Sequence, residues 1–170
     1  MGLGCMEEVL VNEELAWGDP GFATAAYATA LACAPLITGA TEEQKEIWLR
    51  QVAEEGKLAS YAVTEPGAGS DVAACKTTAI LDGDQYVING EKMWITGAGY
   101  SDFFFVLAKT DIDAGYRGMS GFIVDKDAEG FSLGKKESNM GQRCSDTRSI
   151  VFDNVRVDKD RLVGGSESGG

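Results

Sequence analysis

Two Asx-Gly pairs, Asp82-Gly83 and Asn89-Gly90, divide the middle of the 170-residue chain into short segments. The segments are rich in Ile, Val, Tyr, Thr and Trp, which are residue types that favour strands. They cover residues 76–81, 85–88 and 91–96. An Asx-Gly pair readily supplies the positive φ angles that a tight hairpin turn requires. The pattern therefore predicts a three-stranded meander, and with it a fold in which antiparallel pairing dominates.

Further strand candidates follow downstream at short intervals. They cover residues 103–108, 121–124, 131–133 and 149–157. Glycine occurs 22 times, nearly twice its usual share of roughly 7%, which favours many turns. Many short strands without alternating helices predict a β-barrel or sandwich.

The first third of the chain has the pattern of helices. Apolar residues recur at helical spacing among acidic side chains, at Leu3, Met6, Leu10 and Trp17. An alanine-rich stretch follows, and its small side chains would let a helix pack close to its neighbours. Pro35 is expected to break or kink that helix. The fold class predicted is thus α+β, with N-terminal helices packed on a mainly antiparallel barrel or sandwich.

Helix boundaries are predicted by capping residues. Asp19 can cap a helix in which Pro20 occupies the first position. Thr41 and Gln44 have the spacing of a capping box, and Gly56 is placed to end the helix that the box begins.

The charge and composition of the chain exclude several functions. A net charge of −12 disfavours binding to nucleic acid or to an anionic membrane surface. The absence of histidine excludes Ser-His-Asp and Cys-His nucleophiles and histidine-based zinc sites. The four cysteines form no CxxC pair and indicate a reducing compartment. We expect no signal peptide and no metal site, and no membrane helix because no run approaches the roughly 20 apolar residues that such a helix needs.

The loop that follows residues 61–63 is the first candidate for ligand binding. It reads Thr64-Glu65-Pro66-Gly67-Ala68-Gly69-Ser70-Asp71. Gly67 and Gly69 would let backbone N–H groups approach a ligand, and such a turn can form an anion-binding nest. The loop matches neither a Walker loop nor the GxGxxG pattern. From the residues alone, an ordinary turn is an equally good interpretation.

A second candidate is the segment 92–97. Because strand side chains alternate, Trp94 and Thr96 should lie on the same face. An indole and a hydroxyl on one face could hold a flat aromatic cofactor. A core Trp beside a half-buried Thr is the simpler interpretation of the same residues.

A third candidate is the polar segment 139–148. A hydrogen-bonded structural turn is the default interpretation, and a ligand-facing loop is the alternative. Four positive charges lie in or near it and could meet phosphates: Lys135, Lys136, Arg143 and Arg148.

Together these segments resemble the acyl-CoA dehydrogenase family. The resemblance rests on the run 61–71, on the run 89–96 and on the run 139–148, which is closest to the medium-chain branch. It implies α,β-dehydrogenation of a fatty acyl-CoA, as in fatty acid β-oxidation, with FAD as the oxidant and a glutamate as the base. The partners it implies are the acyl-CoA substrate and an electron-transfer flavoprotein, with a homotetramer as the full-length form.

The resemblance also implies roles for individual residues. Thr64 would lie near the pyrimidine side of the flavin, while Trp94 and Thr96 would flank it. Ser70 would lie between a cofactor phosphate and the pantetheine arm of the substrate, so that it binds both. The implied cofactor-binding set is Tyr61, Val63, Thr64, Gly69, Ser70, Trp94, Ile95 and Thr96.

By the same resemblance, residues 1–56 are the later helices of an N-terminal domain and residues 57–161 are the middle β-domain. Residues 162–170 would be a linker toward a C-terminal helical bundle, which carries the glutamate base. Glu65 is not predicted to be that base. We therefore expect the isolated chain to be inactive and to bind FAD weakly or not at all. An acyl-CoA oxidase relative and a non-catalytic flavin-binding module are the alternatives, and the compartment expected is the bacterial cytoplasm or the mitochondrial matrix.

Overall fold

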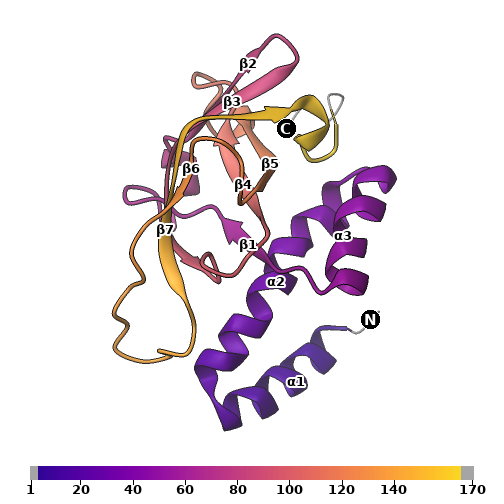
Figure 1. The fold of residues 1–170 in the computed structure, drawn as a ribbon, viewed down its shortest axis with the longest axis vertical. Helices are drawn as coiled ribbons and strands as arrows, with labels where there is room; N and C mark the ends of the chain where they lie inside the picture. Colours follow the sequence, from indigo (N-terminus) through magenta and orange to yellow (C-terminus); the bar gives the residue numbers. More distant parts are fainter. Residues whose placement is uncertain (1–3, 166–170) are drawn as a thin grey trace.

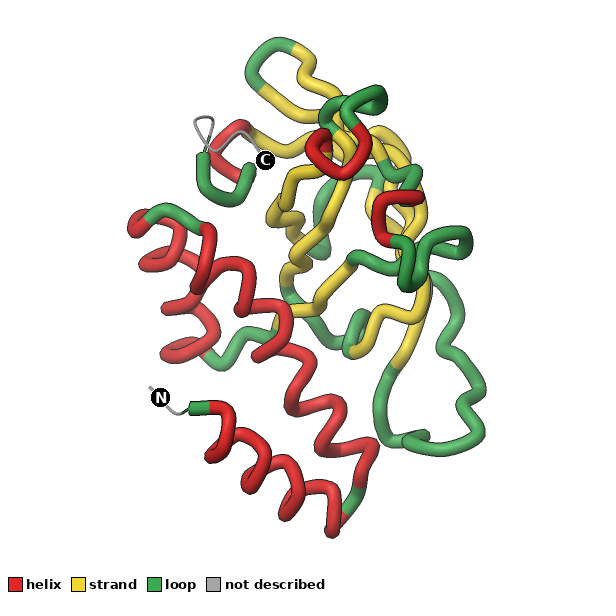
Figure 2. The backbone as a smooth tube through the Cα atoms, turned by 180° about the vertical axis from the view of Figure 1, so that it is seen from behind, coloured by secondary structure: helices red, strands yellow, loops and turns green. Residues whose placement is uncertain are grey.

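The computed structural model describes residues 4–165, in which three helices precede a seven-stranded sheet (Figure 1). The helices are α1 (Cys5–Gly18), α2 (Pro20–Gly39) and α3 (Glu42–Glu55). They lie together on one side of the curled sheet, as Figure 2 shows from behind. The predicted α+β class is thus confirmed. Leu3 and residues 166–170 of the predicted linker lie outside the described part of the chain.

The predicted helix caps are all present. The Oδ1 atom of Asp19 accepts a hydrogen bond from the backbone N of Phe22 at 2.7 Å. Thr41 and Gln44 form both hydrogen bonds of a capping box at the start of α3. Gly56 ends that helix in the left-handed conformation, with φ 70°. These local hydrogen bonds fix where the helices begin and end.

Helix α2 departs from two expectations. Pro35 lies inside it, and the helix continues through this residue to Gly39. By length and composition α2 is also apolar enough to cross a membrane, although no such run was expected. Its contacts explain this composition, because one face packs against β1 (Ala59–Ala62) and buries Ala32 and Leu36. The buried face of α2 therefore forms part of the folded core, whereas Phe22, Leu31 and Ile37 of the same helix are exposed.

One curled mixed sheet forms the second part of the molecule, with the shape of a half-barrel (Figure 1). Besides β1, its strands are β2 (Thr78–Asp82), β3 (Gln85–Thr96), β4 (Phe103–Lys109), β5 (Met119–Asp125), β6 (Phe131–Leu133) and β7 (Thr147–Asp158). The order is β1-β4-β2-β3-β7-β6, with β5 paired to β4. Both β1 and β2 run parallel to β4, and the other pairs are antiparallel. The candidate strands downstream of residue 100 are all confirmed.

The predicted three-stranded meander is wrong in one respect. Asp82 pairs with Gln85 across a tight hairpin turn, as predicted. The second pair, Asn89-Gly90, makes no hairpin, because β3 continues through it with only a register shift. Gly90 has φ 149°, and a Cβ there would lie 2.5 Å from Oγ1 of Thr77. Glycine is thus required at this position for a bulge and a close approach of two backbones.

Two apolar clusters hold the molecule together. One fills the inside of the curled sheet and includes the buried Phe104 and Phe122. The other joins α2 and α3 to the sheet, where Trp48 packs against Phe103 with ring centroids 5.0 Å apart. The second cluster packs α2 against β1, β4 and β5, and the candidate site lies beside it, between α2 and the ends of β1 and β3.

Candidate functional site

A groove lies between α2 and the ends of β1 and β3, and we call it the α2 groove. It is lined by Ala28, Leu31, Tyr61, Thr64, Trp94, Ile95 and Thr96. An adjoining hollow shares Ala28, Leu31 and Thr96 and extends along α2 to Thr24, Tyr27 and Gln142. The combined surface is mostly apolar, with the hydroxyls of Thr64 and Thr96 on its sheet side and the amide of Gln142 at its far end. Such a slot suits a flat ligand with polar edges.

Thr64 and Thr96 meet at this groove from two different strands. Thr64 lies two residues after the end of β1, and Thr96 is the last residue of β3. The two segments are joined by a hydrogen bond from the backbone N of Met93 to the carbonyl of Thr64, at 2.8 Å. Within residues 4–165 the hydroxyl of neither threonine has a hydrogen-bond partner. Both hydroxyls are therefore available to a ligand.

Trp94 reaches the groove through an irregularity in β3. The pairing of β3 with β7 shifts register between Lys92 and Ile95, and Trp94 has φ 61°. Simple strand alternation was therefore the wrong reason for expecting Trp94 and Thr96 on one side, although both do line the groove. The Trp94 side chain is 55% exposed, so much of its surface is open to a ligand. Tyr61, which also lines the groove, stacks on Phe105 with ring centroids 5.4 Å apart, and this contact fixes the orientation of the Tyr61 ring.

A buried ion pair lies directly beneath this region. The Nζ atom of Lys92 lies 2.7 Å from Oε1 of Glu65 and donates a second hydrogen bond to the carbonyl of Val63. Lys92 is completely buried and Glu65 nearly so. The Glu65 carboxylate also accepts hydrogen bonds from the backbone N–H groups of Lys76 and Thr77. The pair thus ties β3 to the loop that follows β1.

The surroundings of Glu65 keep it ionised. Burial alone would raise the pKa of its carboxyl group, but the hydrogen bonds from Lys92, Thr77 and Lys76 more than offset burial and hold that pKa below its ordinary value. Burial lowers the pKa of Lys92, and the Glu65 carboxylate opposes that shift. A carboxylate held by three donors is a poor proton acceptor. Glu65 is a structural anchor of the loop, in agreement with its exclusion as a base.

Two serines hold the end of β3 from the β1 side. Ser60 donates a hydrogen bond to the carbonyl of Thr96 at 2.6 Å, and its hydroxyl also contacts that of Ser101 at 2.6 Å. Ser101 in turn donates to the carbonyl of Gly97. Both serines are buried. The backbone at Thr96 is therefore fixed by buried groups, which sets the position of its side chain.

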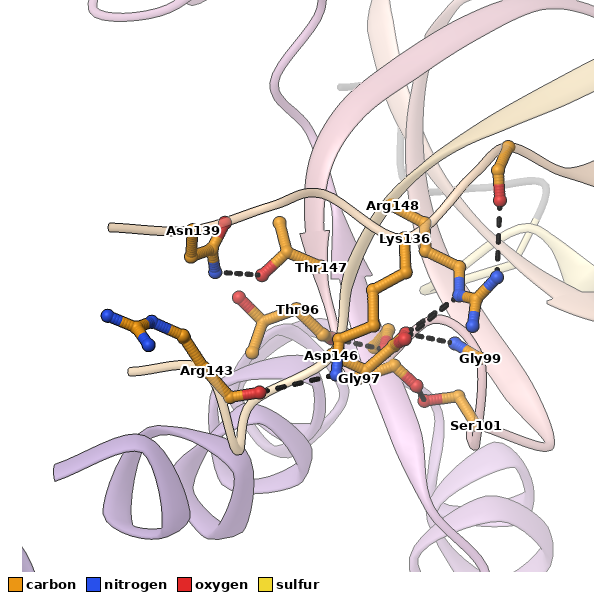
Figure 3. Close-up of polar contacts among 12 residues, drawn as sticks. Thr96, Gly97, Gly99, Ser101, Lys136, Asn139, Arg143, Asp146, Thr147 and Arg148 are labelled. Carbon is orange, nitrogen blue, oxygen red and sulfur yellow. Dashed lines mark hydrogen bonds and ion pairs between the residues drawn. The ribbon is translucent and has the colours of Figure 1, made fainter. Parts of the chain in front are cut away.

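The third predicted segment, residues 139–148, secures the turn after Thr96 (Figure 3). The buried Asp146 accepts a hydrogen bond from the backbone N of Gly99 at 2.7 Å, and its carbonyl accepts one from Gly97. Arg148 forms an ion pair with Asp146 at 2.9 Å. Lys136 donates to a carbonyl of the same loop, that of Arg143. Part of this segment is thus the structural turn that was the default interpretation, and Arg148 is already neutralised.

Three of the predicted cofactor residues do not line the α2 groove. Val63 is buried, and its carbonyl accepts a hydrogen bond from Lys92. Gly69 and Ser70 are exposed on the loop beyond Thr64. No residue between 65 and 71 has a positive φ, so a nest of alternating right-handed and left-handed residues is not built there. The described structure thus brings together five of the eight: Tyr61, Thr64, Trp94, Ile95 and Thr96.

Sequence reasoning missed the contribution of α2 and the ion pair below the groove. Ala28 and Leu31 line the groove from the helix side, and their spacing of three residues on one helix face was the available signal. Glu65 and Lys92 are 27 residues apart, and nothing local indicates that they meet.

Comparison with known proteins agrees with this geometry. The family model for the acyl-CoA dehydrogenase middle domain matches residues 60–155, and the model for the N-terminal domain matches residues 1–56. A probable medium-chain specific acyl-CoA dehydrogenase from Caenorhabditis briggsae is 47% identical over 167 residues, which cover 96% of this chain and 41% of the relative. The chain thus spans well under half the length of this relative.

Solved structures give the same result. Butyryl-CoA dehydrogenase from Megasphaera elsdenii superposes with a TM-score of 0.89 at 39% identity, over 95% of this chain and 42% of that chain. An acyl-CoA dehydrogenase from Bacillus anthracis, solved in complex with FAD, gives a TM-score of 0.88 at 40% identity, over 99% of this chain and 29% of that chain. Fold, groove and sequence agree, and the chain belongs to the acyl-CoA dehydrogenase family.

Proposed function

We propose that the chain forms the flavin-binding and thioester-binding part of an FAD-dependent acyl-CoA dehydrogenase, which converts a fatty acyl-CoA to its trans-2-enoyl-CoA. The observation that supports this most strongly is the convergence of Thr64 and Thr96, from two separate strands, on one groove. Family membership supports the same reaction class. In the whole enzyme, an electron-transfer flavoprotein accepts the electrons and four copies associate, in the cytoplasm of a bacterium or in the mitochondrial matrix.

The residues of the α2 groove fit FAD in their chemistry. Trp94 and Tyr61 offer aromatic surface, while Thr64 and Thr96 offer hydroxyls that have no partner among the described residues. When bound, FAD supplies the two-electron acceptor that dehydrogenation of a saturated acyl chain requires. In this proposal Thr64 and Thr96 hydrogen-bond to edge atoms of the ring system, and the main chain of Ile95 contacts it.

The exposed loop after Thr64 would serve the polar parts of the ligands. A Cβ at Gly67 or Gly69 would meet no atom of the described chain within 4 Å, and neither residue has a positive φ. The fold itself therefore does not require glycine at these positions, whereas a closely approaching ligand would. We assign Gly69 and Ser70 to cofactor binding, and Ser70 also to the pantetheine arm of the substrate. Val63 contributes indirectly, through its hydrogen bond with Lys92.

The catalytic base is not among the groove residues. No acidic side chain lines the α2 groove within the described part of the chain, and Glu65 is engaged with Lys92. Removal of an α-proton requires a carboxylate within reach of the α-carbon. In this proposal a glutamate from another part of the whole enzyme supplies that carboxylate, and the chain alone has no dehydrogenase activity.

The test uses octanoyl-CoA and an artificial electron acceptor. The isolated chain should give no turnover, whereas a longer chain that restores the length of the relatives should oxidise the thioester and lose most of that activity on Thr96→Val. Turnover by the isolated chain would contradict the assignment of the base. A longer, FAD-loaded chain that oxidises no acyl-CoA would contradict the proposed reaction. Anaerobic reduction followed by admission of oxygen would show whether the enzyme instead acts as an oxidase.

A further inference from the structure

Trp94 has an unusual backbone conformation for its residue type. Three described non-glycine residues have positive φ angles: Trp94 at 61°, Gln142 at 53° and Asn154 at 54°. Asparagine tolerates the left-handed region, because its short polar side chain can bond to nearby backbone, whereas a bulky aromatic residue there is a genuine outlier. Backbone strain of this kind persists only where surrounding contacts enforce it. The positive φ of Trp94 must therefore be enforced by contacts of the residues next to it.

The residues on both sides of Trp94 are firmly anchored. On one side, Met93 donates its backbone N–H to the carbonyl of Thr64 at 2.8 Å. On the other side, Ile95 is 1% exposed and resumes the ladder with Arg148 of β7. Trp94 thus spans the register shift between two fixed points and has little freedom to relax.

Displacement of the Lys92 side chain would cost a large amount of folding free energy. Its side chain is completely buried, and its Nζ contacts two acceptors, the Glu65 carboxylate at 2.7 Å and the Val63 carbonyl at 3.1 Å. Glu65 is itself fixed by the backbone N–H groups of Lys76 and Thr77. An ammonium group buried this deeply is held to its partners, because any displacement would leave both charges unpaired. The ion pair therefore fixes the position of β3 immediately before the register shift.

We infer that the buried Lys92–Glu65 ion pair acts as a positioning device, which holds Trp94 in its left-handed conformation and so presents the indole to the α2 groove. The inference deepens the proposed function and rests on it for the role of the groove. Lys92 and Glu65 touch no groove ligand in this view, and they act through the backbone of β3. The alternative is that the pair only stabilises the inside of the sheet, without any particular effect on residue 94.

The test compares alanine with glycine at position 94 in two backgrounds. Both Trp94→Ala and Trp94→Gly remove the indole, and they differ only in how well they tolerate a positive φ. With the ion pair intact, the glycine variant should have the larger folding equilibrium constant by about two- to fivefold, because left-handed strain outweighs the extra chain entropy of glycine. With Lys92→Met and Glu65→Gln together, the backbone can relax and the alanine variant should be favoured by about two- to fivefold.

The matched control is Asn154, another positive-φ residue on β7 that has no contact with the ion pair. Its own glycine-over-alanine preference should be the same in both backgrounds. An unchanged preference at position 94 would overturn the inference. If the double background does not fold, Glu65→Asp replaces it, and a weaker glycine preference at position 94 is then the supporting result.

A spectroscopic readout separates positioning from general stability. In ¹⁵N-labelled protein, the indole N–H resonance of Trp94 should shift and broaden when the ion pair is replaced. The indole of Trp17, which is 92% exposed on α1, should not change. Equal changes at both indoles, or none at Trp94, would contradict a specific effect. Because neither experiment contains flavin, these results are independent of whether the groove binds FAD.

Discussion

The Nζ atom of Lys92 lies 2.7 Å from Oε1 of Glu65, with both side chains buried where the loop after β1 meets β3. The partners of this pair are Val63, which follows β1, and Lys76 and Thr77, which precede β2, while Lys92 itself lies in β3 beside the bulge at Trp94. One interaction therefore connects three segments of the chain, two of which contribute to the α2 groove. Stability and ligand binding should therefore both respond to changes at these two residues.

Removal of one member of the pair should be strongly destabilising. Lys92→Met leaves the Glu65 carboxylate buried without its cation, and a loss of about 3–5 kcal/mol in the free energy of unfolding is expected. Urea denaturation followed by circular dichroism measures it. The control is Asp82→Asn, which breaks an exposed ion pair with Arg156 and should cost less than about 1 kcal/mol. Similar losses in the two variants would contradict the buried character of the pair.

Acid should weaken the protein through Glu65. The hydrogen bonds that outweigh burial make the pKa of this carboxyl group lower in the folded protein than in the unfolded chain. Its stabilising contribution is therefore fully present above the unfolded value of about 4.3 and is lost as the pH falls through the lower folded value. Urea denaturation between about pH 3 and pH 7 should show a smaller loss of stability on acidification for Glu65→Gln than for the unchanged chain. Parallel pH profiles would contradict the shift.

Two glycines of the sheet should differ in their tolerance of alanine. At Gly90 a Cβ would lie 2.5 Å from Oγ1 and 2.7 Å from Cα of Thr77, so Gly90→Ala forces two backbones apart. We expect a loss of about 3 kcal/mol or more, as for other strained backbone sites. Gly83 has φ 65° but open space around it, and Gly83→Ala should cost only about 1 kcal/mol. Thermal unfolding of the two variants side by side provides the measurement.

Gln44 should stabilise the contact between α3 and the end of the described chain. Its amide donates to the carbonyls of Asp160 and Leu162 at 2.7 Å and accepts from the backbone N of Gly164 and of Thr41. Gln44→Met keeps the shape but leaves these groups without their partner, so a loss of about 2 kcal/mol or more is expected. Thr41→Ala removes only the helix cap and should cost about 1 kcal/mol. Equal losses in denaturant titrations would contradict the wider role of Gln44.

Local features of the fold could be predicted from the sequence. The caps at Asp19 and Thr41, the hairpin at Gly83 and most of the strands depend on neighbouring residues, and the structure has them as predicted. Asn89-Gly90 shows where this reasoning fails. The pair has the local chemistry of a turn, but the nearby Thr77 backbone and continued pairing with β7 keep it in an extended strand.

The candidate site could be predicted only in part, for the same reason. Thr64, Trp94 and Thr96 lie in distinctive motifs near the ends of strands, and the structure brings all three to one groove. Their role in cofactor binding stays a prediction. The parallel pairing of β1 with β4, the helix wall at Ala28 and the ion pair at Lys92 all depend on contacts between distant segments. Periodicity carries no information on such contacts.

The central claim is that FAD binds between Thr64 and Thr96, and chemical-shift mapping tests it most directly. FAD at millimolar concentration, which reveals even weak binding, is added to the ¹⁵N-labelled chain. The claim predicts shifts at the amides of Thr64, Ile95 and Thr96 and at the Trp94 indole, all reduced by Thr64→Val with Thr96→Val. Shifts confined to the surface around Gln44 and Arg161, or no shifts at all when the same titration is made with a chain restored to the length of the relatives, would contradict it.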